Sequence, residues 1–148
     1  MLLGFFMDYI QYGYIGLFLA CFIAATIIPL ASEAILIGFL IAGYDPYISW
    51  GLASLGNTLG GVTNYILGTL GKVKSLEKYF KNKEKFNRIK RNIEKYGVWM
   101  GLLTWLPFIG DPLTIFLGFF RVKFIPLFFT MLFAKTLRYF VISLFWLI

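Results

Sequence analysis

Four charged residues stand inside long apolar stretches of the sequence, where charged side chains are costly. Glu33 and Asp111 are acids, and Lys135 and Arg138 are bases spaced i, i+3, which places both on one face of a helix. Each charge would cost about 2.5–3.5 kcal/mol at the centre of a bilayer, so the four are expected to be paired, neutralised or hydrated. Two interpretations stay open. One is a structural ion-pair quartet, and the other is a polar site for an anionic headgroup with an acid that exchanges protons.

The composition is that of an integral membrane protein. The chain has 148 residues, of which 59% are hydrophobic and 14% charged, against about 25% charged in an average soluble domain. Such hydrophobicity excludes a disordered chain and argues against a nucleic-acid-binding module. There is no histidine and one cysteine, so an internal disulfide and Ser-His or Cys-His catalysis are excluded, and a zinc site is not expected. We expect no enzyme activity, no cofactor and no metal.

One basic block sets the expected orientation of the chain. Residues 72–95 carry ten basic and three acidic residues, which account for the whole net charge of +7. Basic loops beside membrane spans stay in the cytoplasm, so residues 72–96 are expected inside, and residues 44–47 and both termini outside. The apolar spacing predicts an amphipathic helix over 75–96, capped by Ser75 and ended by Gly97. This helix either lies on the inner membrane surface and attracts anionic lipid, or only fixes topology.

The apolar segments divide into two broken hairpins and two full spans within a single membrane domain, residues 1–148. Prolines interrupt residues 13–43 and 98–120, so each is predicted to be a re-entrant hairpin, whereas residues 48–71 and 125–148 are each long enough to span. The residues predicted at the hairpin tips are Pro29, Ser32, Pro107, Gly110 and Pro112. Gly56 and Gly60, with the adjacent Gly61, form a small-xxx-small motif that permits close helix contact.

The second half of the chain repeats the first. In the alignment that places Pro29 over Pro107, which we call the repeat alignment, Pro29-Leu30-Ala31-Ser32-Glu33 matches Pro107-Phe108-Ile109-Gly110-Asp111. Both segments read proline, two apolar residues, a small residue and an acid. One full span separates the two hairpins, so they should enter the membrane from opposite faces. The expected fold is therefore an all-α membrane protein built as an inverted repeat, in which each re-entrant hairpin is followed by a spanning helix.

The same residues carry a resemblance to a known family. Ala31-Ser32-Glu33, Gly56-Asn57-Thr58-Leu59-Gly60-Gly61 with Asn64, Trp105-Leu106-Pro107-x-x-Gly110-Asp111 and Ala134-Lys135-x-x-Arg138-Tyr139 make the sequence similar to the DedA superfamily, also called the VTT or SNARE-associated Golgi domain, in its YqaA-like branch. The resemblance implies re-entrant hairpins, a prokaryotic plasma or inner membrane location and lipid flipping or scrambling driven by the proton-motive force. The sequence departs from the family pattern at the second hairpin, where Gly110-Asp111 stands in place of arginines.

Three functions follow as hypotheses. The first is a flippase or scramblase for a phospholipid or polyprenyl phosphate, with Glu33 and Asp111 handling protons, Lys135 and Arg138 holding phosphate, and Asn57 and Asn64 lining the path. The second is a non-transporting scaffold that organises lipid. The third is an intramembrane aspartyl hydrolase, which Gly110-Asp111 suggests but for which no second aspartate lies in a span. The expected partners are anionic lipids, protons and a second copy of the chain.

Overall fold

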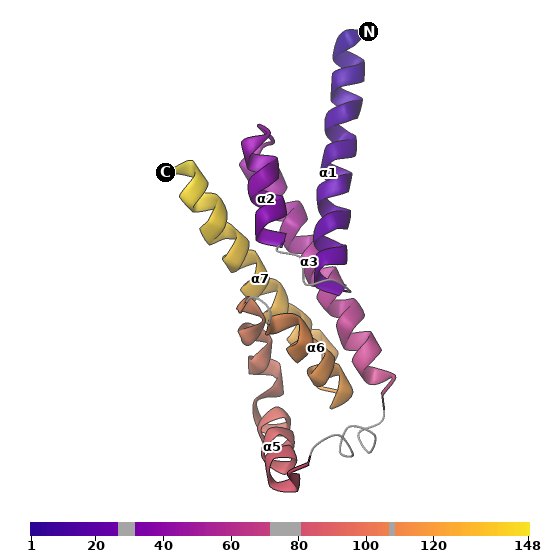
Figure 1. The fold of residues 1–148 in the computed structure, drawn as a ribbon, viewed down its shortest axis with the longest axis vertical. Helices are drawn as coiled ribbons and strands as arrows, with labels where there is room; N and C mark the ends of the chain where they lie inside the picture. The colour runs from indigo at the N-terminus through magenta and orange to yellow at the C-terminus, as the bar shows by residue number, and fades with distance from the viewer. Residues whose placement is uncertain (27–31, 72–80, 107–108) are drawn as a thin grey trace. The chain divides into compact units, whose positions relative to one another are not determined.

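A computed structural model describes residues 1–26, 32–71, 81–106 and 109–148, and every regular element within these ranges is a helix (Figure 1). Pro29, Pro107, Ser75 and the rest of residues 72–80 lie outside the described residues. The elements are α1 (Leu2–Thr26), α2 (Ser32–Ile41), α3 (Pro46–Thr69), α5 (Lys83–Met100), the 3₁₀ helix η1 (Gly101–Trp105), α6 (Gly110–Phe119) and α7 (Phe124–Leu147).

The chain forms two compact units. Unit 1 contains residues 1–60 and 135–148, and unit 2 contains residues 61–134. Helices α3 and α7 each contribute one part to each unit. Among the described helices, α7 is the one that is long and apolar enough to cross a bilayer by length and composition. The similarly long α3 is less apolar, because glycine, serine, threonine and asparagine recur along it.

Unit 1 is held together by the packing of four helices. Helix α2 packs against α1 (Figure 1). The core contains buried side chains from α1, α2, α3 and α7, namely Leu17, Cys21, Leu36, Leu40, Ala53 and Tyr139. The indole N–H of Trp50 donates to the carbonyl oxygen of Thr136 over 2.9 Å and so ties α3 to α7.

The two glycines of the predicted motif bring α3 against α1. A Cβ at Gly56 would lie 2.5 Å from the carbonyl oxygen of Phe18, and one at Gly60 would lie 2.7 Å from that of Phe22. A side chain at either position would therefore collide with the backbone of α1, so glycine permits the close approach of the two helices. Gly61 is buried at the start of the part of α3 that belongs to unit 2.

In unit 2, glycines also permit close contact between two helices, α3 and α6. The core of unit 2 contains Tyr65, Ile93, Leu117, Leu127 and Met131. A Cβ at Gly118 would overlap the carbonyl oxygen of Tyr65, and a Cβ at Gly68 would overlap that of Ile115, so each helix presents a glycine to the backbone of the other. The hydroxyl of Tyr65 also donates to the carbonyl oxygen of Val122, at 2.5 Å.

The helix boundaries of the two halves coincide in the repeat alignment. The alignment places both ends of α2 (Ser32–Ile41) over the ends of α6 (Gly110–Phe119), and both ends of α3 over the ends of α7. The turns that follow α2 and α6 also match: Gly43 has φ +92°, and Arg121, its counterpart in the alignment, has φ +54°. The three backbone hydrogen bonds that close the turn after α2 recur with the same spacing after α6. The two halves of the chain therefore share a local backbone plan.

The basic amphipathic helix differs from its prediction at both ends. It begins at Lys83, because Asn82 caps it by accepting hydrogen bonds from the backbone N–H groups of Glu84 and Lys85. The prediction that Gly97 ends the helix is wrong, since α5 continues to Met100. A Cβ at Gly97 would lie 2.7 Å from a methyl group of Val122, so this glycine serves close packing rather than termination.

Replacing Gly118 with alanine should destabilise unit 2. The added methyl group must displace the Tyr65 backbone, which we expect to cost about 1–3 kcal/mol, as overpacking of a close contact does. Gly38→Ala in α2 is the matched control, because a Cβ there meets nothing within 4 Å, and alanine should be neutral or stabilising by up to about 1 kcal/mol. Unfolding of the detergent-solubilised variants measures both changes, and equal stability of the two would contradict the close contact.

Candidate functional site

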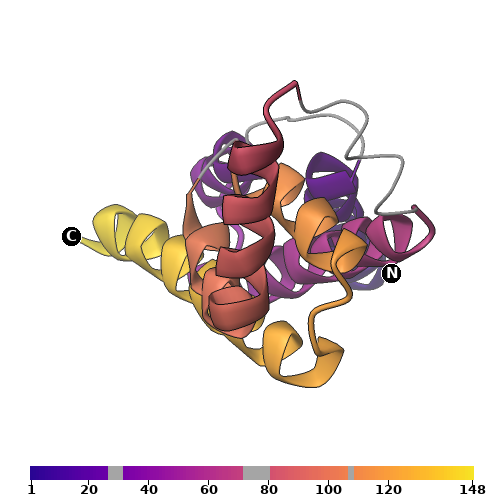
Figure 2. The same ribbon diagram turned by 90° about the horizontal axis from the view of Figure 1, so that it is seen from below.

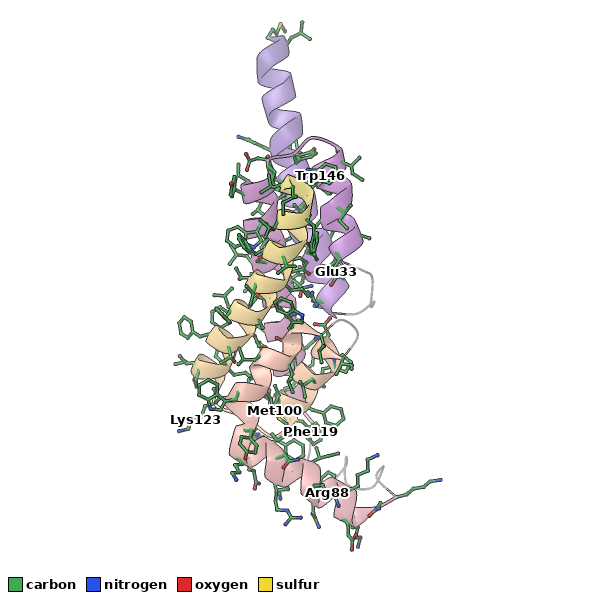
Figure 3. All side chains as sticks on the ribbon, turned by 90° about the vertical axis from the view of Figure 1, so that its left-hand side faces the viewer. Glu33, Arg88, Met100, Phe119, Lys123 and Trp146 are labelled. Atoms are coloured by element: carbon green, nitrogen blue, oxygen red, sulfur yellow. The ribbon has the colours of Figure 1, made fainter. Side chains whose placement is uncertain are left out.

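Two of the predicted intramembrane charges form an ion pair in unit 1. The Nε atom of Arg138 on α7 lies 3.3 Å from Oε1 of Glu33, and the two side chains are 12% and 27% exposed. Figure 3 shows Glu33 at the start of α2, beside α7. Glu33 stands in the first turn of α2, where the helix dipole favours an acid. Both side chains are thus largely shielded but keep some exposed surface.

The second cation of α7 is fully buried. Lys135 lies one turn before Arg138 and has no exposed surface. Its ammonium group donates to two oxygens of one residue on α3, the side-chain carbonyl of Asn57 at 2.6 Å and the backbone carbonyl of Asn57 at 3.1 Å. Such hydrogen bonds are what a buried charge requires. Sequence reasoning expected the intramembrane charges to be paired, neutralised or hydrated, and it did not predict that Asn57 binds Lys135.

Hydroxyl groups connect these two charged sites. The Asn57 side-chain N–H₂ donates to the carbonyl oxygen of Cys21 at 3.3 Å and to Ser32 Oγ at 3.5 Å. Ser32 Oγ is hydrogen-bonded to the hydroxyl of Tyr139 at 2.5 Å. Arg138 donates to that same tyrosine hydroxyl at 3.0 Å. Polar contacts therefore run without interruption from Lys135 to Glu33, through side chains of α2, α3 and α7.

We call this set of residues the polar network; its members are Ser32, Glu33, Asn57, Lys135, Arg138 and Tyr139. Sequence reasoning identified four of them as site residues and placed Ser32 only at a hairpin tip. Tyr139 was missed, although a hydroxyl-bearing residue directly after an arginine in an apolar helix is the signal that could have found it. Its ring also lies 4.9 Å from the guanidinium carbon of Arg138, measured to the ring centroid, and so adds a cation–π contact.

The remaining predicted site residues belong to unit 2. Asp111 and Pro112 lie in the first turn of α6, where proline does not interrupt helical hydrogen bonds. Gly110 begins that helix, and a Cβ there would lie 2.7 Å from the carbonyl oxygen of Thr104. Asn64 is buried in α3. Unit 1 thus gathers Glu33 with both cations, whereas Asp111 and Asn64 lie in the other unit.

The polar network combines two capabilities. A guanidinium has five N–H donors in a planar fork, which can hold a carboxylate and a phosphate oxygen in two-point contacts. A carboxylate beside it can accept a proton and so weaken its hold on the arginine. In surroundings of low polarity each of these electrostatic interactions is stronger than in water. The side chains of the polar network can therefore bind an anion at the guanidinium of Arg138.

The hydroxyls of Ser32 and Tyr139 should contribute jointly to stability. Ser32→Ala and Tyr139→Phe each remove one half of their hydrogen bond, so the double mutant should lose about 0.5–1.5 kcal/mol less than the sum of the single losses. Unfolding in detergent measures the cycle. Tyr12→Phe, at a tyrosine that is 72% exposed, is the control and should change little. Strictly additive losses would mean that the two hydroxyls are not coupled.

Comparison with known proteins now places the chain in a family. The VTT domain family matches residues 28–146, which include the whole polar network. The chain is 32% identical over 125 residues to the inner membrane protein YqaA of Escherichia coli, covering 84% of each protein, and equally to that of Shigella flexneri. It is also 27% identical over 135 residues to an uncharacterized protein of Haemophilus influenzae, covering 83% of this chain and 80% of that protein. No solved structure matches. The chain therefore belongs to the VTT domain family, the DedA family that its motifs predicted.

Proposed function

We propose that this protein is a multi-pass protein of a prokaryotic inner membrane that moves an anionic amphiphile, a phospholipid or a polyprenyl phosphate, across the bilayer. Its relatives in Escherichia coli and Shigella flexneri are named inner membrane proteins, which supports the location. The apolar surface of α7, with Phe129 and Phe133 each 62% exposed, supports contact with lipid. The recurrence of helix boundaries in the repeat alignment supports the expected architecture, two re-entrant hairpins in an inverted repeat.

The ion pair between Glu33 and Arg138 carries this proposal. A soluble protein has little reason to place such a pair within apolar helices, and in a membrane each charge is expensive and marks a functional site by default. A purely structural pair could be replaced by apolar side chains, often without loss of stability. The partial exposure of both side chains supports a role that requires access.

In the proposed mechanism, the guanidinium of Arg138 binds the phosphate of the lipid headgroup. While Glu33 is ionised, it competes with the phosphate for the guanidinium of Arg138. When Glu33 is protonated, it releases the guanidinium. Lys135 adds a second positive charge one helical turn away and, through Asn57, holds α7 to α3. Ser32 and Tyr139 keep the guanidinium oriented. Proton binding at Glu33 and phosphate binding at Arg138 are therefore coupled, and Asp111 is the corresponding acid of the second hairpin.

Reconstitution into vesicles tests this mechanism. Arg138→Lys keeps the charge but loses the planar fork, so lipid translocation should fall about tenfold or more, given the 1.5–3 kcal/mol of a charge-assisted hydrogen bond. Glu33→Gln keeps the shape of the side chain but not its ionisation, so translocation should lose its response to a proton gradient. The assay follows fluorescent phosphatidylglycerol across the bilayer of proteoliposomes, with and without a proton gradient.

Two exposed residues of α5 supply the controls, since Glu84→Gln and Arg88→Lys make the same two exchanges away from the polar network. Both control variants should translocate lipid as the parent does. If both site variants translocate lipid normally and only unfold more easily, the polar network is structural and the transport proposal fails. A parent protein that binds lipid but does not move it would support the scaffold instead.

The orientation is tested separately by cysteine labelling in intact cells. On a Cys21→Ala background, Asn92→Cys on α5 should be protected from a membrane-impermeant maleimide, because the basic segment is expected in the cytoplasm. Tyr47→Cys, at a position 67% exposed in the predicted outer turn, should react. The reverse pattern of labelling would overturn the proposed orientation.

A further inference from the structure

Helix α5 changes character abruptly along its exposed side. From Lys81 to Lys95 every exposed residue is charged or asparagine. From Tyr96 onward, through η1 and up to Ile109, every exposed residue that the structure describes is aromatic or aliphatic; these are Tyr96, Trp99, Leu102, Leu103, Leu106 and Ile109. Tyrosine and tryptophan at such a boundary are typical of a membrane–water interface. In the membrane location proposed above, this change sets the membrane surface within one helical turn of Tyr96.

The turn between α6 and α7 lies beside the part of α5 where the exposed residues change from polar to apolar. A Cβ at Gly97 would lie 2.7 Å from Val122, so the turn between α6 and α7 touches α5 directly at the boundary. Arg121 and Lys123 flank Val122 and are both exposed, and the exposed residues that follow them on α7 are apolar. Four cations, Arg91 and Lys95 of α5 with Arg121 and Lys123 of the turn, therefore lie at or just outside the same interface.

The apolar face of α5 is already used. Phe86 and Ile93 are buried in unit 2, where Phe86 lies 6.1 Å from Phe120 between ring centroids, and α5 runs beside α6 (Figure 2). The helix cannot lay this face into a membrane, as a surface-lying amphipathic helix would. Its polar face is what remains exposed, and Figure 3 shows nitrogen-bearing side chains gathered around Arg88.

We propose that Arg91, Lys95, Arg121 and Lys123 bind the headgroups of anionic phospholipids at this membrane surface. Arg91 lies five residues before Tyr96, about 7.5 Å along the helix, and a headgroup layer is about 5–8 Å thick. Lys95 is closer still, and its ammonium group lies 5.1 Å from the centroid of the Tyr96 ring. The spacing of Arg91 and Lys95 at i, i+4 puts both cations on one side of α5.

A groove beside Arg91 offers polar partners in addition to charge. It has a volume of about 460 Å³ and is lined by Asn87, Lys90, Arg91 and Glu94. Lys90 and Arg91 suit the phosphate, and Glu94 can accept hydrogen bonds from the hydroxyls of a glycerol headgroup. The bound lipid is thus an anionic phospholipid of the surrounding bilayer. This inference rests on the membrane location proposed above but not on the transport mechanism.

Spin-labelled lipids in reconstituted vesicles test the proposal. The full chain is placed in phosphatidylcholine vesicles that contain a trace of spin-labelled phosphatidylglycerol or spin-labelled phosphatidylcholine, and electron paramagnetic resonance measures the motionally restricted fraction of each. We expect a preference for phosphatidylglycerol that falls with added salt. Arg91→Gln with Lys95→Gln should reduce this preference roughly five-fold or more, because each basic residue near the surface contributes on that scale.

Lys83→Gln with Lys85→Gln is the matched control, because it removes the same charge from the far end of α5, about 17–20 Å from Tyr96 and beyond the range of screened attraction. The control should keep the preference. Three results overturn the proposal. The preference is lost in both double variants, or it is retained in the Arg91 and Lys95 variant, or the parent protein shows no preference. If the basic segment only fixes topology, the parent protein should show no preference, because the protein is already inserted in the vesicle membrane. Translocation is measured on the same vesicles, so a failure of transport with an intact preference leaves the lipid site standing.

Discussion

The arrangement of unit 1 depends on the need to solvate a buried ammonium group without water. Lys135 has no exposed surface, and its charge is stabilised by two carbonyl oxygens of Asn57. One of these oxygens belongs to the backbone of α3, so α7 must stay within hydrogen-bond reach of that helix. Asn57 in turn uses its N–H₂ group on Cys21 and Ser32, which brings α1 and α2 to the same point. One charge therefore determines where four helices meet.

The repeat gives the chain one backbone plan and two different sets of side chains. Helices α2 and α6, and α3 and α7, share their boundaries in the repeat alignment. Position 57 carries asparagine where position 135 carries lysine, and position 60 carries glycine where position 138 carries arginine. The glycine of the first copy lets α3 approach α1, whereas the arginine of the second copy makes the ion pair with Glu33. Two positions that match in the repeat alignment thus have different roles. Position 60 permits close helix packing, and position 138 supplies a charge.

Much of the backbone plan could be predicted from the sequence, because it follows from local rules. Apolar length predicted α3 and α7 to within two residues, and the proline and acid pattern predicted the repeat. The start of α5 at Lys83 was not predicted, since Asn82 sets it by capping the helix and apolar spacing does not encode a cap. The hydrogen bond between Tyr139 and Ser32 could not be predicted, because it joins residues 107 positions apart, and no periodicity encodes such a contact.

The turn before α7 shows how far a shared backbone plan constrains its residues. Gly43 adopts a positive φ at no cost, whereas Arg121 holds the corresponding conformation although an L side chain there costs about 1–2 kcal/mol. A basic side chain near an anionic membrane surface contributes about 1 kcal/mol. At the lipid contact proposed for Arg121, conformational strain and electrostatic attraction are thus of similar size. With that contact, the second copy of the turn gains a cation for lipid binding at a position where its backbone favours glycine, so one backbone plan can serve a different role in each of its two copies.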